Sequence, residues 1–301
     1  MLSKNEIKAF AILPKTITQL AEDLEISKAA SFKITEKLVQ DGLSNKTRQG
    51  KKVIVSRERT IHAQELREIL QEFPRIPIEE ILSHSSLTLL SILNYPLHSE
   101  EIRQILNITR QWTYKQIKNL SKYGIILKEK KEYTVNPLHN KIHSFAKNYH
   151  IYKNNQKVRT ISEDAQILWQ QGNEFLFKTI KDLASYQITA VTAFSNYNLP
   201  LLGNTKYYYQ SNRILQTSDI ILHTILLNPE SKTYNTYACL LYAKTHPKDI
   251  IKKAKIYNLT EHIKEIILFS EQQQSDKNFL PTWDEYKSIA QQYGVRPYEH
   301  V

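Results

Sequence analysis

Residues 26–43, ISKAASFKITEKLVQDGL, and residues 108–125, ITRQWTYKQIKNLSKYGI, are two versions of one element. The second stretch lies 82 positions after the first, and the two align without a gap. The correspondence continues upstream, where Pro14 matches Pro96 and Leu20 matches Ile102. Similarity at a fixed offset indicates one structural unit that occurs twice in the chain.

Each copy predicts three helices. The first should end near the proline, and the third should begin at Ser27 or Thr109, because a hydroxyl oxygen there can accept a free backbone N–H. The third should end at Gly42 or Gly124, since a left-handed C-terminal residue needs no Cβ. The second helices are expected at residues 16–25 and 99–106. Only a few residues separate the second helix from the third, which is typical of a helix-turn-helix.

A predicted β-hairpin follows each glycine. In residues 43–56, LSNKTRQGKKVIVS, the turn is expected at Gln49 and Gly50. Residues 125–136, IILKEKKEYTVN, repeat the pattern with two residues fewer. Two β-favouring runs around a short polar turn indicate a hairpin. A hairpin directly behind a helix-turn-helix is the wing of a winged helix.

Both copies resemble the winged helix-turn-helix DNA-binding domains of bacterial and archaeal transcription regulators. The residues that carry this resemblance are Ile26, Ser27, Leu38, Gly42 and Leu43, and again Ile108, Thr109, Leu120, Gly124 and Ile125. The resemblance implies a helical DNA-binding fold with small hairpins, and double-stranded DNA as the partner.

The third helix of each copy is predicted to contact the DNA bases. An α-helix about 10–12 Å across fits the major groove, so its early exposed residues would face base edges while nearby cations meet phosphates. The expected contacts of the first copy are Lys28, Phe32, Lys33, Lys46, Arg48, Lys51 and Lys52. Those of the second copy are Arg110, Gln111, Trp112, Tyr114, Lys115, Lys118, Lys128, Lys130 and Lys131.

The two copies differ in the chemistry they offer. Arg110 could take guanine bidentately and Gln111 could take adenine, so the second copy is better suited to reading bases. In the first copy Ala29 and Ala30 offer no hydrogen bonds, which favours phosphate contacts there. Trp112, like Tyr114 beside it, could equally pack between domains.

The charge distribution supports a polyanionic partner. The formal net charge is +11, and residues 1–160 hold 27 basic against 16 acidic residues. Residues 161–301 hold 14 of each, so the whole excess belongs to the half with the repeat. A basic half joined to a neutral half favours nucleic acid as the partner of the former.

The chain divides into five predicted segments. Two winged helices are expected at residues 1–60 and 78–137, joined by a connecting helix at 61–77, and a helix and linker follow at 138–157. The connecting helix could fix the separation of the two copies or pair with its counterpart in a homodimer, which we also expect. The polar stretch NNQKVRTISED places the last boundary near residue 155, before a C-terminal effector or dimerisation domain at 158–301.

The C-terminal domain reads as mostly helical. A short helix at residues 192–197 and a strand at 207–210 precede expected helices at 219–227, 233–244, 248–257, 260–269 and 282–293. ITAVTAFSNYNL, KYYYQS and SDIILHTIL weakly resemble the C-terminal domain of antitoxins paired with nucleotidyltransferase toxins, which implies a protein partner.

No pattern in the sequence predicts catalysis, a metal site or a cofactor. Six glycines leave little room for phosphate-binding loops, and a nucleotidyltransferase needs spaced acidic metal ligands that do not follow Gly203. His223, His246 and His262 are scattered, and the single Cys239 lies in an apolar segment, so each fits the core or surface. With no membrane-length apolar run and no signal-like N-terminus, we expect a cytoplasmic protein.

These observations predict a transcription regulator with tandem winged helices. Two alternatives remain open. One is an antitoxin or protein–protein adaptor with autoregulatory DNA binding, and the other is a nucleic-acid or chromatin-like binder without sequence preference.

Overall fold

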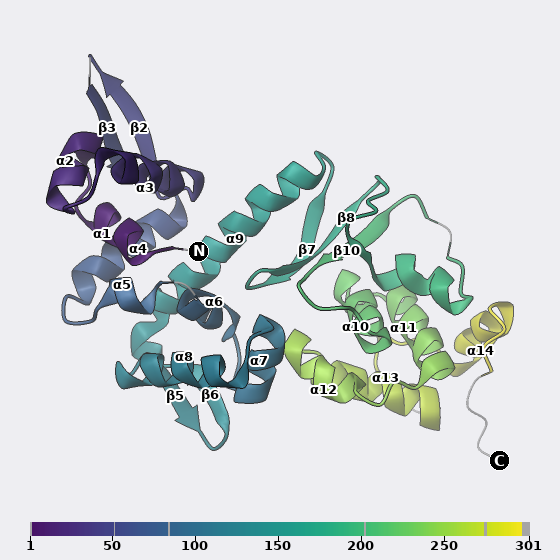
Figure 1. Cartoon of the computed structure of the whole chain (residues 1–301). Coiled ribbons are helices and arrows are strands. Elements are labelled where there is room, and N and C mark those ends of the chain that lie inside the picture. Colours follow the sequence, from purple (N-terminus) through teal and green to yellow (C-terminus); the bar gives the residue numbers. More distant parts are fainter. Residues whose placement is uncertain (1, 51, 84, 202, 274–275, 297–301) are drawn as a thin grey trace. The chain divides into compact units, whose positions relative to one another are not determined.

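The computed structural model describes residues 2–50, 52–83, 85–201, 203–273 and 276–296 (Figure 1). The chain forms two compact units, residues 1–156 with 171–173 and residues 157–170 with 174–301. Helices predominate in the described residues, and the strands there form three small antiparallel sheets. The predicted class, mainly helical with small hairpins, is therefore confirmed at this level.

The first copy of the repeat has three helices and a three-stranded sheet. Its elements are α1 (Lys4–Ala11), β1 (Lys15–Thr16), α2 (Ile17–Asp23), α3 (Lys28–Gln40), β2 (Ser44–Gln49) and β3 (Lys52–Arg57). The sheet order is β1-β3-β2, with Lys46 opposite Val55 in the hairpin. Phe10, Leu20 and Leu38 are buried between the helices and the sheet.

The second copy has the same element order. Its elements are α6 (Ser85–Ile92), β4 (Leu97–His98), α7 (Ser99–Leu106), α8 (Arg110–Lys122), β5 (Ile126–Glu129) and β6 (Glu132–Val135). The sheet order, β4-β6-β5, is that of the first copy. Ile102 and Leu120 are buried at the positions of Leu20 and Leu38. At these two aligned positions the copies therefore bury equivalent side chains.

The ends of α3 and α8 confirm the predicted caps. The Ser27 hydroxyl accepts the Ala30 N–H at 3.2 Å, and the Thr109 hydroxyl accepts the Trp112 N–H at 3.3 Å. At the other end, Gly42 and Gly124 both have a φ of +67°. The amides that follow these glycines return to the carbonyls of Leu38 and Leu120, which is the Schellman motif. Serine or threonine at one end and glycine at the other therefore set the length of each helix.

Helices outside the two copies complete the first unit. The predicted connecting helix is α4 (Ile61–Glu72), followed by the short α5 (Ile78–Ile81) and, after the second copy, by the 3-10 turn η1 (Pro137–His139) and α9 (Asn140–Ile161). Glu65 of α4 accepts hydrogen bonds from Ser144 and Asn148 of α9 at 2.5 and 2.8 Å. Helix α4 therefore packs against α9 of its own chain. The boundary between the two units falls at residues 156 and 157, close to the boundary predicted near residue 155, although α9 continues through the polar stretch to residue 161.

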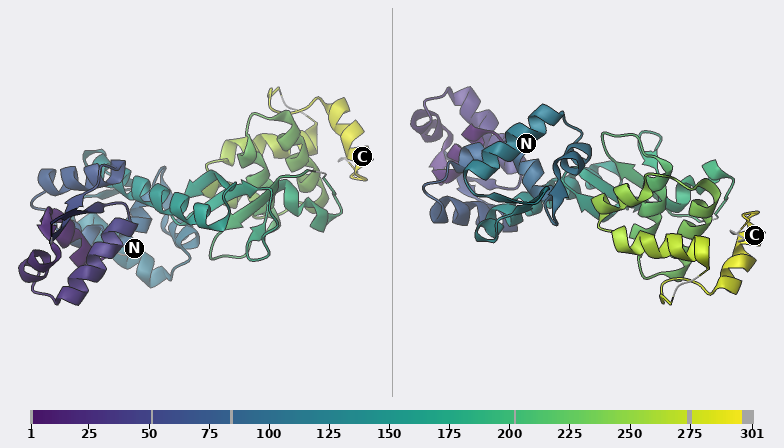
Figure 2. Two further views of the ribbon diagram at one scale, coloured as in Figure 1. Left: turned by 90° about the horizontal axis from the view of Figure 1, so that it is seen from above. Right: turned by 90° about the horizontal axis from the view of Figure 1, so that it is seen from below.

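The second unit combines a sheet with helices. Its elements are β7 (Gln166–Gln171), β8 (Glu174–Thr179), β9 (Gln187–Ile188), η2 (Ala190–Tyr197), β10 (Lys206–Gln210), α10 (Thr217–Leu227), α11 (Lys232–Thr245), α12 (Ile250–Ala254), η3 (Lys255–Tyr257), α13 (Thr260–Gln272) and α14 (Trp283–Gln292). Helices α10 and α11 lie side by side (Figures 1 and 2). The expected helices were all found, although that at 248–257 is divided into α12 and η3.

The sheet of this unit is larger than the sequence predicted. Its order is β7-β8-β10-β9, all antiparallel, whereas only the strand at 207–210 was expected. Strand β8 is buried on both faces, so EFLFKT lacks the alternation that marks a half-buried strand. Gly172, with a φ of +57°, makes the turn between β7 and β8.

None of the helices in the described residues combines the length and the apolar character that crossing a membrane requires.

Candidate nucleic-acid interface

The early turns of α3 present polar side chains on one face. Ser31, Thr35 and Leu38 are buried at helical spacing, so the opposite face is exposed. That face carries Lys28 and Lys33, both exposed. The remaining exposed residues of these turns include Ala29, Phe32 and Glu36.

The first hairpin folds one of its cations back onto α3. The Lys46 ammonium forms an ion pair with Glu36 and lies 4.7 Å from the centre of the Phe32 ring, which is 50% exposed. The Arg48 guanidinium donates to the Gly50 carbonyl at 3.2 Å. Lys52 is exposed, and Lys51 lies outside the described residues. In this copy, part of the predicted cationic surface is neutralised by the chain itself.

Helix α8 presents the stronger cationic face. Its 13 residues include Arg110, Lys115, Lys118 and Lys122, and they contain no carboxylate. These four side chains are exposed, as is Gln111. Because no acidic residue opposes them within the helix, their charges add. Lys122 was not among the predicted contacts, although it lies one helical turn beyond Lys118.

Two aromatic residues of α8 are fixed at this surface. The Trp112 indole N–H donates to the Ser85 hydroxyl at 2.8 Å, and the ring is 39% exposed. The Tyr114 ring is 43% exposed, and its hydroxyl lies 3.5 Å from the Ser99 hydroxyl. The hydrogen bond from Ser99, followed by the nearby Arg110, lowers the pKa of Tyr114.

The same rings lie beneath the cations of the helix. The Lys115 ammonium is 5.0 Å from the Trp112 ring, and the Arg110 guanidinium is 5.6 Å from the Tyr114 ring. Such cation–π contacts restrict flexible side chains without neutralising their charge. Two cations of α8 are therefore held by aromatic rings of the same helix, and within the first unit these rings are not buried between the repeats.

The second hairpin adds three cations. Lys128, Lys130 and Lys131 are exposed, and Lys130 has a φ of +55° in the turn. The Lys128 ammonium lies 5.7 Å from the Tyr133 ring. Glu132, on the returning strand, lies 3.3 Å from the His98 imidazole. This hairpin thus presents a mixed surface in which the basic residues are at the tip.

A buried ionic cluster holds the C-terminal end of α3. Asp41 is 0% exposed, and its carboxylate accepts from the Tyr149 hydroxyl at 2.6 Å, the Lys153 ammonium at 2.5 Å and the Lys37 ammonium at 3.0 Å. Burial opposes ionisation of Asp41, but the bonds from Lys153 and Tyr149 outweigh it and lower the pKa of the carboxyl group. We call these four residues the Asp41 cluster. It fastens α3 to α9, and Tyr123 occupies the matching position after α8.

The glycines at the two helix ends have different neighbours. A Cβ placed on Gly42 would lie 2.4 Å from the Tyr152 ring of α9, whereas one on Gly124 would meet no atom within 4 Å. Both carbonyls are capped alike, Gly42 by the Thr60 hydroxyl at 2.7 Å and Gly124 by the Asn136 amide at 2.8 Å. The equivalent ends of the two helices are therefore packed differently.

A second polar cluster lies in the core of the C-terminal unit. Asp219 is 0% exposed and accepts from Arg213 at 2.8 Å, Lys253 at 2.5 Å and the Tyr257 hydroxyl at 3.0 Å. Burial raises the pKa of Asp219, but Arg213 and other nearby cations lower it below its ordinary value overall. Glu174 balances the second positive charge, 3.3 Å from Arg213. Since these charges are paired within the chain, the cluster reads as a structural network.

The histidine and cysteine of the core have no exposed reactive atom. His223 is hydrogen-bonded to Thr189 at 2.7 Å and to Tyr257 at 2.9 Å, and burial lowers its pKa to about 3. Burial raises the pKa of the Cys239 thiol to about 12, which disfavours the nucleophilic thiolate. In the described residues, no group of three or more His, Cys, Asp and Glu side chains is arranged to hold a metal ion.

Comparison with known proteins adds one finding. Residues 183–295 match a family model described as "HVO_2833_C, C-terminal", which covers less than half of the chain. The comparisons with curated proteins and with solved structures found no match. The matched segment begins after β8 and ends after α14, so it lies wholly within the second unit.

Proposed function

We propose that this protein is a DNA-binding transcription regulator, and that residues 1–60 and 78–137 are tandem winged helix-turn-helix domains. The repeated order of helices and hairpin, with the same sheet order in both copies, supports the winged-helix assignment. The observation that carries the functional proposal is α8, whose exposed face has four cations and no carboxylate. A surface of that kind favours a polyanion.

In this proposal α8 enters the major groove. Arg110 and Gln111, on its first turn, are the side chains suited to hydrogen bonding with guanine and adenine edges. Lys115 and Lys118, on the following turns, would meet phosphates together with the tip of the second hairpin. The hydrogen bond from Trp112 to Ser85 fixes the start of the helix, so less side-chain freedom is lost on binding.

The first copy contributes affinity more than sequence reading. Lys28 and Lys33 are exposed there and form no ion pair with a carboxylate among the described residues, whereas Lys46 is already paired with Glu36. A phosphate could compete with Glu36 for Lys46. That exchange contributes less to the free energy of binding than a contact with an unpaired ammonium, because the existing ion pair must be broken. Bound at a promoter, such a protein would act by occluding or recruiting the transcription machinery.

Selection of bound fragments from a random duplex pool tests this proposal. A consensus sequence is expected, with a guanine or adenine at the positions contacted by α8. Length-dependent binding without a consensus would instead identify a nucleic-acid-coating protein, and no retention of DNA at low salt would refute both.

Charge reversal then locates the interface. Lys115→Glu should weaken binding to the selected duplex by at least about tenfold, because it removes one phosphate contact and adds a repulsion. Lys33→Glu should weaken it less. Lys181→Glu, an exposed lysine of the second unit, is the charge-matched control and should leave affinity unchanged. An effect of Lys181→Glu equal to that of Lys115→Glu would show that only net charge matters.

A further inference from the structure

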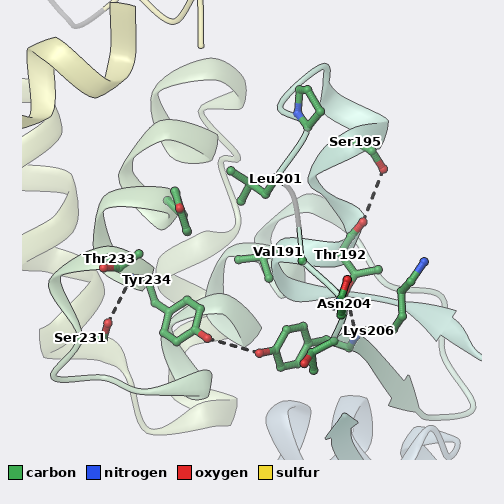
Figure 3. Close-up of a pocket in the computed structure, with 14 residues that line it drawn as sticks. Val191, Thr192, Ser195, Leu201, Asn204, Lys206, Ser231, Thr233 and Tyr234 are labelled. Atoms are coloured by element: carbon green, nitrogen blue, oxygen red, sulfur yellow. Dashed lines mark hydrogen bonds between the residues drawn. The ribbon is translucent and has the colours of Figure 1, made fainter. Parts of the chain in front are cut away.

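A hollow in the C-terminal unit has the size and the lining of a small-molecule site (Figure 3). Its volume is about 610 Å³, within the range of ligand pockets in proteins. Ser231, Thr233 and Tyr234, at the start of α11, form one side. Thr192 of η2 and Asn204, before β10, face them across the opening.

The lining is rich in hydroxyl groups and poor in charge. Five serines and threonines, three tyrosines and one asparagine contribute to it, together with a few apolar residues. Among the described residues of the lining, Lys206 is the charged one, and its ammonium is paired with Asp182 at 2.9 Å. A site of this composition offers hydrogen bonds without demanding a strongly charged ligand.

Part of this hydrogen-bonding capacity is already used to shape the walls. The Thr192 hydroxyl accepts the Tyr207 N–H at 2.8 Å, and the Tyr207 and Tyr234 hydroxyls lie 3.3 Å apart. Burial, followed by the bond to Tyr234, raises the pKa of Tyr207, so the Tyr207 hydroxyl stays protonated near pH 7. The walls are therefore fixed by internal contacts before any ligand arrives.

Other polar groups of the lining remain available. Within the described part of the chain, the Asn204 amide and the hydroxyls of Thr205, Thr233 and Tyr237 make no hydrogen bond. These groups supply both donors and acceptors. The side chains of Val191 and Leu201 give the same hollow apolar surface. Donors, acceptors and apolar faces in one neutral site match a ring that carries several hydroxyl groups.

We propose that this hollow binds a neutral, polyhydroxylated ring compound, namely a sugar or the sugar of a nucleoside. The binding site lies within the second unit and does not depend on the proposed contacts with DNA. It gives residues 157–301 a ligand-sensing role that neither the repeat nor the family match assigns.

Calorimetric titration of the full-length protein tests the proposal. The probes are glucose, maltose, adenosine and cytidine, with inorganic phosphate as the charged comparison, each up to about 20 mM so that even millimolar affinity is detected. Saturable binding of one ligand per chain is expected for a sugar or a nucleoside, and which of them binds identifies the source. No saturable binding, or binding of phosphate alone, would overturn the proposal.

Two conservative variants locate the binding. Thr233→Val and Tyr237→Phe each remove one of the available hydroxyls and should weaken binding roughly 2- to 10-fold. Tyr186→Phe removes a tyrosine hydroxyl outside the lining and is the matched control. Circular dichroism should show that all three variants are folded. Equal affinity in the wild type and in both pocket variants would place any binding elsewhere and refute the assignment.

Discussion

Replacing Gly42 and Gly124 by alanine gives a matched pair that tests how the two repeats are packed. Both glycines have a φ of +67°, so each substitution forces an L-residue into the left-handed region at a cost of about 1–2 kcal/mol. Only the Cβ at position 42 meets another side chain, 2.4 Å from the Tyr152 ring. Relieving that overlap should cost about 1–3 kcal/mol more.

The expected losses follow directly. Gly124→Ala should lower the free energy of unfolding by about 1–2 kcal/mol, and Gly42→Ala by about 2–5 kcal/mol. Urea unfolding of the full-length chain, followed by far-ultraviolet circular dichroism, measures both. Tyr152→Ala removes the obstructing ring, so Gly42→Ala in that background should cost only as much as Gly124→Ala. The reasoning fails if the two alanine variants are equally stable, or if the excess loss at position 42 survives in the Tyr152→Ala background.

Three further predictions concern charge and assembly. DNA affinity should fall about 100-fold between 50 and 200 mM salt if about four phosphates are contacted, and a flat salt profile by fluorescence anisotropy would argue against phosphate binding. Burial lowers the pKa of His150 to about 4, so the unfolded state binds the extra proton as the pH falls from 6.5 towards 4. Stability present above pH 6.5 should therefore decline by about 3 kcal/mol by pH 4, and His150→Gln should flatten this part of the urea-unfolding profile. Light scattering should report the mass of two chains, and a monomer at micromolar concentration would refute the homodimer expected from the sequence.

The helix ends of the repeat could be predicted because local chemistry determines them. A hydroxyl at Ser27 or Thr109 and a glycine at Gly42 or Gly124 act within one turn of the backbone, so the sequence near each end is sufficient. The exposed faces of α3 and α8 could also be predicted, from the helical spacing of the residues that these helices bury. Even the polar face of α8, with Arg110 at its start, needed no knowledge of distant residues.

Contacts between distant residues escaped prediction. The partners of Asp41 in α9 lie 108 and 112 positions later, and no sequence pattern joins them. The ion pair of Glu36 with Lys46 depends on how the hairpin bends towards α3, which periodicity does not specify. The sheet in the C-terminal unit was missed because β8 is buried on both faces and resembles a buried helical segment.

The hollow beside α11 could not be predicted from the sequence either. Its residues come from η2, the segment before β10 and the start of α11, and only folding brings them together. The Tyr207 hydroxyl lies against that of Tyr234 in the wall of the hollow, a contact that no sequence pattern indicates.

The Asp41 cluster makes the two repeats unequal in how they can diverge. Lys153 and Tyr149 reach the end of α3, whereas the end of α8 is closed by its own glycine and by Asn136 from the same copy. A substitution at either of these α9 positions therefore disturbs the anchoring of α3 and leaves that of α8 unchanged. Duplicated elements with separate anchors are free to acquire separate tasks, and the surface chemistry of α3 and α8 already differs in the direction this would allow.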